Sequence, residues 1–148
     1  MSVKARIQDD MKSAMRAKQR ERLGTIRLIM AAIKQREVDE RVELDDTQTV
    51  AVLDKMLKQR RESAAQYRQA GRDDLAAKEE AEIGVIEDYM PQPLSDEEID
   101  LLISEAIAAT HAQSVKDMGQ VMAYIKPKAQ GRVDMAAISA RVKTRLAL

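Results

Sequence analysis

The chain has 148 residues, with no Cys, one His and three Tyr as the only aromatic residues, and its 25 basic and 25 acidic side chains leave a formal net charge of zero. This length fits one ordinary domain or two small ones. Without Cys there is no disulfide or zinc–thiolate site, and one His cannot build a multi-His metal site. No apolar run reaches the roughly 18 residues of a membrane span and no signal peptide is evident, so we expect a cytoplasmic protein.

The charge is unevenly distributed along the chain. Residues 1–36 hold ten basic and three acidic residues, and residues 37–90 hold eight basic and fifteen acidic ones. Residues 91–114 hold five acids and no Lys or Arg, whereas residues 115–148 hold seven basic and two acidic residues. Segments of opposite sign either meet a charged partner or pair with one another inside the fold.

The sequence predicts helices throughout. Only 5 Gly and 3 Pro interrupt it, helix-forming residues dominate, and no segment alternates apolar and polar residues over the length of a strand. In the first ninety residues, apolar side chains recur at helical spacing in the stretches Val3–Met15, Leu23–Ile33, Val50–Tyr67 and Leu75–Met90. Arg60 occupies a position in the third apolar stripe. Asp45 or Asp46 is expected to cap the third helix and Asp73 the fourth, and Gly71 to end the third.

The strongest break is Met90-Pro91-Gln92-Pro93, because each proline removes a backbone donor and disfavours helical geometry in the residue before it. We therefore expect an all-α fold with a helical N-terminal domain at residues 1–90 and a small three-helix tail domain at residues 94–148. Ser95 and Glu98 match a capping box at the start of the second domain. A shorter helix should begin at Ser114 and end at Pro127 and Gly131, and Asp134 should cap the last helix.

No catalytic constellation is evident. His111 lies between two predicted helices and is interpreted as an exposed loop residue, and no segment matches a glycine-rich phosphate loop. Gly119 stands early in a helix, where Gly costs roughly 1 kcal/mol relative to Ala. Either a close helix crossing or a ligand that approaches the backbone would explain it, and the packing explanation is preferred. We expect no cofactor and no metal.

Basic residues cluster near the C-terminus. Lys126, Lys128 and Arg132 flank an expected turn beside the capped start of the last helix, where flexible cations suit phosphate contacts. Lys116, Lys143 and Arg145 form an outer set, and Arg141 belongs to the same basic segment. The scarcity of aromatic residues disfavours base stacking, so any RNA would be bound through its shape and backbone.

Several motifs follow one another in a recognisable order. They are residues 14–18 (AMRAK), 27–34 (RLIMAAIK), 58–63 (KQRRES), 67–76 (YRQAGRDDLA), 89–95 (YMPQPLS), 116–122 (KDMGQVM) and 131–134 (GRVD). Together they resemble the YqeY family over nearly the whole chain. Pro91, Ser95, Gly119, Gly131 and Asp134 are the motif positions we single out as structural.

The resemblance implies a relation to the C-terminal helical and tail domains of GatB, a subunit of the amidotransferase that converts Glu-tRNA(Gln) or Asp-tRNA(Asn) to the amidated form. It implies an all-helical bacterial protein whose tail domain contacts tRNA, while the catalytic centres of the amidotransferase lie in other domains and subunits. Our first hypothesis is a freestanding module that binds tRNA or structured RNA and has no catalytic centre.

Two other hypotheses remain. One is an adaptor that docks a synthetase or an amidotransferase component through the basic first helices and the acidic middle segment. The other is an enzyme that acts on aminoacyl-tRNA, or an accessory to carbon–nitrogen ligase activity with glutamine as the amide donor, and we expect no amidation by this chain alone. None of the three hypotheses involves a membrane.

Overall fold

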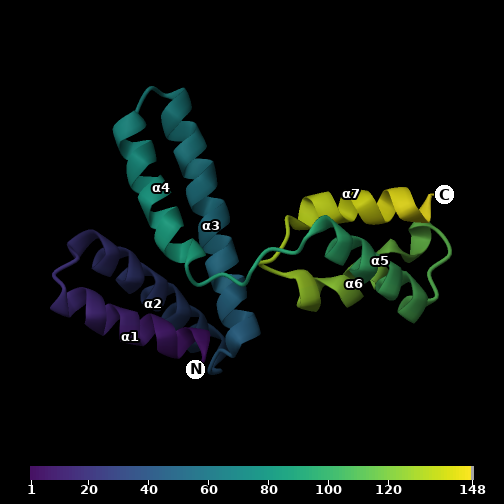
Figure 1. Ribbon diagram of the computed structural model, residues 1–148, viewed down its shortest axis with the longest axis horizontal. Helices are drawn as coiled ribbons and strands as arrows, with labels where there is room; N and C mark the ends of the chain where they lie inside the picture. The colour runs from purple at the N-terminus through teal and green to yellow at the C-terminus, as the bar shows by residue number, and fades with distance from the viewer. Residues whose placement is uncertain (148) are drawn as a thin grey trace. The chain divides into compact units, whose positions relative to one another are not determined.

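The computed structural model describes residues 1–147, which form seven α-helices, one short 3-10 helix and no strand (Figure 1). The predicted all-α fold is therefore confirmed. The chain divides into two compact units, Met1–Met90 and Pro91–Leu148. No helix within residues 1–147 has the length and apolar character needed to cross a lipid bilayer.

The first unit is built from two helical hairpins (Figure 1). Its helices are α1 (Val3–Arg16), α2 (Arg20–Glu40), α3 (Asp46–Gln69) and α4 (Asp73–Glu87). The turn between α1 and α2 contains Lys18 at φ 57°, and the turn between α3 and α4 contains Gly71 at φ 73°. Gly71 suits that turn because it adopts a positive φ without the steric cost that a side chain brings.

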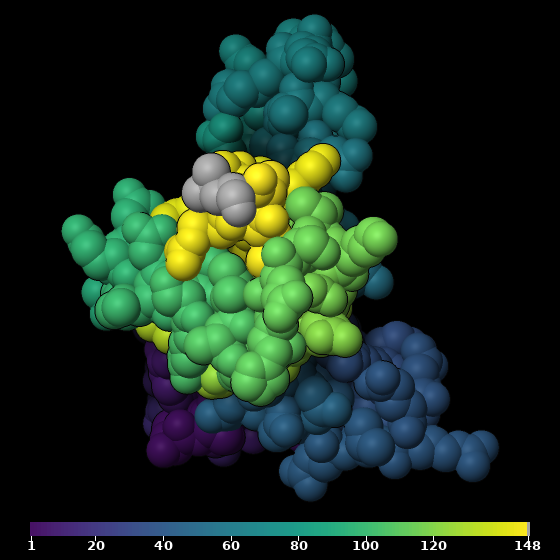
Figure 2. Space-filling model, turned by 90° about the vertical axis from the view of Figure 1, so that its right-hand side faces the viewer, coloured from purple at the N-terminus to yellow at the C-terminus, as the bar shows by residue number. Residues whose placement is uncertain are grey.

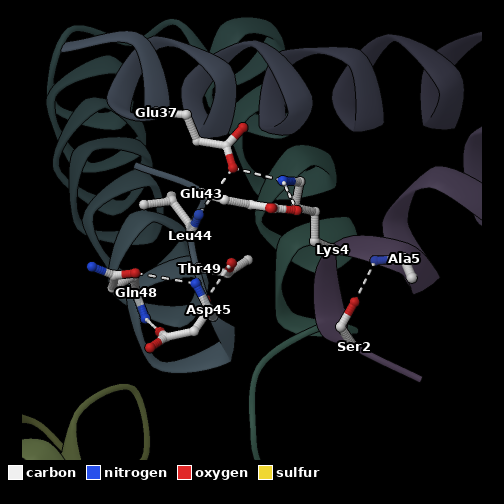
Figure 3. A network of polar contacts seen from close by, with 9 residues as sticks. All are labelled: Ser2, Lys4, Ala5, Glu37, Glu43, Leu44, Asp45, Gln48 and Thr49. Atoms are coloured by element: carbon white, nitrogen blue, oxygen red, sulfur yellow. Dashed lines mark hydrogen bonds and ion pairs between the residues drawn. The ribbon is translucent and has the colours of Figure 1, made fainter. Parts of the chain in front are cut away.

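Polar side chains define where the helices of this unit begin. Asp45 accepts from the backbone N–H of Gln48, and Gln48 returns a side-chain contact to the backbone of Asp45, which completes a capping box at the start of α3 (Figure 3). The expected cap at Asp73 is wrong, because Arg72 holds the cap position without a side-chain hydrogen bond. Asp73 lies in the first turn of α4 instead, where the helix dipole favours a carboxylate.

The core of the first unit contains side chains from all four helices. The buried cluster comprises Ile7, Ala14, Ile26, Ile29, Ile33, Leu44, Val52, Leu53, Met56, Leu57, Ile86 and Tyr89. Met15 is an exception among the residues predicted to face inward, since it is 51% exposed. A helix turns about 100° per residue, and here Ala14 faces the core while Met15 faces solvent.

The second unit consists of α5 (Asp96–Thr110), the 3-10 helix η1 (Val115–Asp117), α6 (Met118–Ala129) and α7 (Met135–Leu146). Figure 2 looks onto this unit and shows α7 in yellow beside the green side chains of α5. The core of the unit is a separate buried cluster of Ile103, Ala106, Val121, Ile125, Ala129, Ile138, Val142 and Leu146. Ser95 and Glu98 form a capping box at the start of α5.

The expectation that Pro127 ends its helix is wrong by two residues. Pro127 lies inside the last turn of α6, which continues to Ala129. A proline removes one backbone hydrogen-bond donor. Because Pro127 lies only two residues before the end of α6, few helical hydrogen bonds are affected. The Gln130 N–H still donates to the Lys126 carbonyl at 3.0 Å, and Gly131 follows at φ 78°.

Candidate nucleic-acid interface

The turn between α6 and α7 is held in a defined position by backbone contacts. The Leu94 N–H donates to the Arg132 carbonyl at 3.0 Å, and Arg132 Nε donates to the Gln92 carbonyl at 2.9 Å. Asp134 is the N-cap of α7 and accepts from the Ala136 N–H at 3.0 Å. The segment after Pro91 therefore fixes the turn that carries Arg132 and follows Lys126 and Lys128 of α6.

Lys128 belongs to a small polar cluster on the side of α6. Its ammonium donates to the Tyr124 hydroxyl at 2.9 Å and lies 4.2 Å from the centre of the Tyr124 ring. Glu105 on α5 accepts from the Tyr124 hydroxyl at 2.9 Å, and its carboxylate lies 3.5 Å from the ammonium. The hydrogen bond to Tyr124 is the main reason that the pKa of Lys128 is raised. Glu105 offsets part of the charge that Lys128 would present to a phosphate.

Three other candidate cations have no acidic partner among the described residues. Lys116, Lys126 and Lys143 are exposed, and none of them forms an ion pair within the part of the chain that the structure describes. Arg145 donates to the Ser104 hydroxyl at 2.8 Å, and Arg132 donates to a backbone carbonyl. Because these acceptors are neutral, both guanidinium groups retain their full charge.

The six candidate cations do not form one cluster. Helices α6 and α7 run in opposite directions, so Lys126, Lys128 and Arg132 lie at the end of the unit where the α6–α7 turn is (Figure 1). Lys116 on η1 and the last turn of α7, with Lys143 and Arg145, lie at the other end. The 12 residues of α7 correspond to a helix of roughly 18 Å, which approximates the separation of the two groups.

Arg141 shows how the acidic segment offsets the basic one. It pairs with Asp96 at 3.5 Å and more closely with Asp100, and both acids lie on α5. Asp96 and Asp100 stand four residues apart and therefore share a face of that helix. This spacing is the signal in the sequence that could have indicated a paired Arg141, although it does not identify the partner.

The structure also bears on the interpretations given to Gly119 and His111. A Cβ atom built on Gly119 would meet nothing within 4 Å, so the predicted close helix crossing is wrong. His111 ends α5 at φ 55° and is exposed, as expected. Among residues 1–147 the structure shows no group of three or more His, Cys, Asp or Glu side chains arranged to hold a metal ion.

The fold and the charged surfaces define an all-helical protein of two units, whose second unit carries exposed cations in two separate groups. The chain belongs to the family described as Yqey-like protein, whose family model matches residues 4–146. The resemblance of its motifs to this family is thereby confirmed.

Curated fungal proteins named "Altered inheritance of mitochondria protein 41, mitochondrial" are similar to this chain. The protein from Pyrenophora tritici-repentis is 30% identical over 141 residues, which cover 93% of this chain and 77% of the relative. The Saccharomyces cerevisiae protein is 30% identical over 93% of this chain and 74% of its own length. The Meyerozyma guilliermondii protein is 42% identical over 81 residues, 55% of this chain and only 42% of that relative.

These relatives correct one expectation and leave another unsupported. The expected cytoplasmic location is wrong on this comparison, because the relatives are named as mitochondrial proteins. A bacterial source receives no support either, since the similar curated proteins are fungal. Composition could not have revealed the compartment, because it describes the folded domain and not the route by which a protein reaches its location.

Proposed function

We propose that the second unit binds tRNA or another structured RNA through phosphate contacts, and that this chain contributes no catalytic step of its own. The observation that carries the proposal is the set of exposed lysines without an acidic partner among the described residues, Lys116, Lys126 and Lys143. Phosphate contacts position RNA without base-specific chemistry. The relation to the tail domain of GatB that the resemblance to the YqeY family implies supports the same ligand.

The charges of the second unit are separated rather than in excess. Residues 91–148 hold seven basic and seven acidic residues, but five of the seven acids lie on α5 and the free lysines lie on η1, α6 and α7. A local basic surface on a neutral unit favours moderate binding that depends strongly on salt, because each phosphate contact releases counterions. The proposal is therefore a weak, shape-directed RNA contact and not a tight sequence-blind one.

The test is a gel shift with the full chain and bulk tRNA at about 50 and 200 mM salt. A complex should form at low salt and weaken steeply at the higher concentration. The double substitution Lys126→Gln/Lys143→Gln should reduce the slope of log affinity against log salt by up to about 1.5, because two phosphate contacts are lost.

Lys128→Gln is the matched control, since it removes a lysine from the same helical turn as Lys126. It should reduce the salt slope less than Lys126→Gln alone does, because Glu105 already offsets the charge of Lys128. The absence of any complex at low salt would reject RNA binding. An equal loss of tRNA affinity for Lys128→Gln and Lys126→Gln would show that the lack of an acidic partner does not decide which lysines contact RNA.

A second candidate function is a protein adaptor in aminoacyl-tRNA metabolism. One observation favours it: Arg20, Arg27 and Lys34 on α2 are exposed and form no ion pair within residues 1–147. A pull-down with the full chain separates the two functions. Recovery of a synthetase or an amidotransferase component that survives RNase supports the adaptor, whereas recovery lost on RNase treatment supports RNA binding.

A further inference from the structure

The outward face of α2 carries a row of cations at a regular spacing. Arg20, Arg27, Lys34 and Arg41 are each seven residues apart, and all four are exposed. Seven residues are nearly two helical turns, so Arg20, Arg27 and Lys34 lie in one row at intervals of about 10.5 Å. Arg41 is the C-cap of α2 at φ 56° and follows this row at the end of the helix. None of the four forms an ion pair or a side-chain hydrogen bond with the rest of the described chain.

An apolar strip runs beside this cationic row. Leu28 is 46% exposed, Val38 59% and Val42 45%, and Ala31 is exposed on the same face. Leu28, Ala31 and Val38 follow one another at steps of three and seven residues, which keeps them on one side of the helix. Val42 lies just beyond the end of α2. The buried side chains Ile26, Ile29 and Ile33 leave from the opposite side. Helix α2 is therefore apolar on two faces, and only one of them is used by the core.

The cationic and apolar rows meet at an open hollow. Lys34, Val38, Arg41 and Val42 line it together with Glu43 and the Lys4–Glu37 ion pair, and its volume is about 420 Å³. Lys4 does not contribute free charge there, because its ammonium lies 2.6 Å from Glu37 and 3.6 Å from Glu43 (Figure 3). The hollow gives the end of the α2 face a depression into which a partner's side chain fits.

These rows have the pattern of one half of a helix–helix interface. A phosphate backbone would use the cations and leave Leu28, Val38 and Val42 in water, whereas a helix with its own apolar strip would bury them. Rows that repeat every seven residues match a partner helix with the same period, and flanking charges of opposite sign select the partner and its register. The complement of this face is a helix with an apolar strip bordered by carboxylates.

We propose that the outward face of α2, the row Arg20, Arg27, Lys34 and Arg41 with the strip Leu28, Ala31, Val38 and Val42, docks an acidic amphipathic helix of a partner protein. The proposal specifies the docking surface of the adaptor function and does not depend on RNA binding by the second unit. Its partner is identified by chemistry: exposed Glu or Asp at seven-residue intervals beside Leu, Ile or Val.

The acidic helices of a second copy of this chain offer few free carboxylates. On α5, Asp96 and Asp100 pair with Arg141, Glu105 lies 3.5 Å from Lys128 and Glu98 accepts from the Ser95 N–H. In the acidic middle segment, six carboxylates are already held in ion pairs on α3 and α4, which join Asp54, Asp73, Asp74, Glu80, Glu82 and Glu87 to Lys58, Arg60, Arg61, Arg68 and Arg72. Breaking these pairs to form an intermolecular contact would exchange one ion pair for another at no net gain. The charge complementarity of the α2 face therefore points to a different protein.

The experiment uses the full chain and a synthetic fluorescent peptide of three heptads with Leu at the two core positions and Glu at the two flanking ones. A matched peptide carries Lys in place of every Glu. Fluorescence anisotropy at low salt should show at least tenfold tighter binding of the Glu peptide. The double substitution Arg27→Glu/Lys34→Glu should reverse the preference, so that the Lys peptide binds better.

Two controls keep the result specific. Lys55→Glu/Lys78→Glu changes two exposed lysines on α3 and α4 that form no ion pair within the described residues, and it should leave the preference unchanged. Val38→Asn should weaken the Glu peptide while the circular dichroism spectrum stays the same, because the apolar strip is interrupted without a change of charge.

Three outcomes would overturn the proposal. The first is no binding of the Glu peptide up to millimolar concentration, and the second is an equal effect of the control substitutions. The third is binding to vesicles that contain phosphatidylserine, lost in Arg27→Glu/Lys34→Glu, without binding of the Glu peptide, which would assign the face to a lipid surface. None of these outcomes decides the tRNA gel shift, in which the substitutions Lys126→Gln/Lys143→Gln and Lys128→Gln lie in the second unit.

Discussion

The two units of this protein differ in how much core supports them. The buried cluster of the first unit contains twelve residues drawn from four helices and the segments between and after them, whereas that of the second contains eight residues from α5, α6 and α7. A domain below roughly 70–80 residues rarely gains more than about 3–5 kcal/mol from a single core. The same kind of substitution should therefore remove a larger share of the stability of the second unit than of the first.

The largest expected effect comes from a cavity in each core. Ile125→Ala in α6 and Ile29→Ala in α2 both truncate side chains with 0% exposure. Each should cost about 2–5 kcal/mol, which approaches the whole stability of the second unit. Amide hydrogen exchange should show loss of protection across residues 91–147 for Ile125→Ala and continued protection of the first unit for Ile29→Ala. If each substitution removes protection from both units together, they unfold as one.

The next effect concerns ion pairs in the two units. Arg60 and Glu82 are 16% and 17% exposed and lie 2.9 Å apart across the α3–α4 hairpin. Glu82→Gln leaves the Arg60 charge partly buried without its counterion and should cost about 1–3 kcal/mol. Asp100→Asn in the second unit removes a partner of Arg141 that is 63% exposed, and should cost less than about 1 kcal/mol.

Urea unfolding of the two variants measures this difference. The double substitution Arg60→Leu/Glu82→Leu is the control, because replacing both members of a buried pair by apolar residues is often neutral. A cost for Glu82→Gln no larger than that for Asp100→Asn would contradict the role given to burial.

A smaller effect is expected at the two capping boxes. Asp45 begins α3 in the first unit and Ser95 begins α5 in the second, each with a reciprocal contact to the third residue of its helix. Asp45→Ala and Ser95→Ala should each cost about 1 kcal/mol. Because the second unit has less stability to lose, Ser95→Ala should raise the population of its unfolded state more visibly in hydrogen exchange. Ser139→Ala, in the interior of α7, should have little effect.

The helices could be predicted from the sequence because their apolar stripes are regular. The stripe Leu23–Ile33 predicts the buried side of α2, and the buried Ile26, Ile29 and Ile33 agree with it. The outward face of the same helix was missed, since Leu28 and Val38 fall between the stripe positions and a search for one buried face passes over them. A helix that is apolar on two sides requires the fold to show which side is covered.

The candidate site was only partly predictable for a related reason. Local sequence identifies Lys126 and Lys128 as cations of one turn, but it cannot show that Glu105, 23 residues before Lys128, offsets one of them. Arg141 and Asp100 are 41 residues apart and meet only because α5 and α7 are neighbours. Charged residues can be counted from the sequence, but the packing of the helices decides which of them remain free to bind a partner.

The smallest expected effect is a dependence on pH within the first unit. Glu37 accepts from Lys4 at 2.6 Å and from the Leu44 N–H at 2.9 Å, and these contacts, with Lys4 first, hold its pKa below the usual 4.5 (Figure 3). A lowered pKa means that the ionised carboxylate stabilises the folded state above pH 4.5, and that this contribution is lost as the pH falls below 4.5 through the lowered value.

Glu37→Gln removes this contribution but keeps an oxygen that accepts a hydrogen bond. The wild-type chain should therefore lose more stability than Glu37→Gln when the urea midpoint of the first unit is compared at pH 6 and at about pH 3. Glu62→Gln changes an exposed acid that forms no ion pair within residues 1–147, and it should follow the wild-type chain. Parallel pH profiles for Glu37→Gln and the wild-type chain would show that the contacts of Glu37 with Lys4 and Leu44 do not depend on its charge.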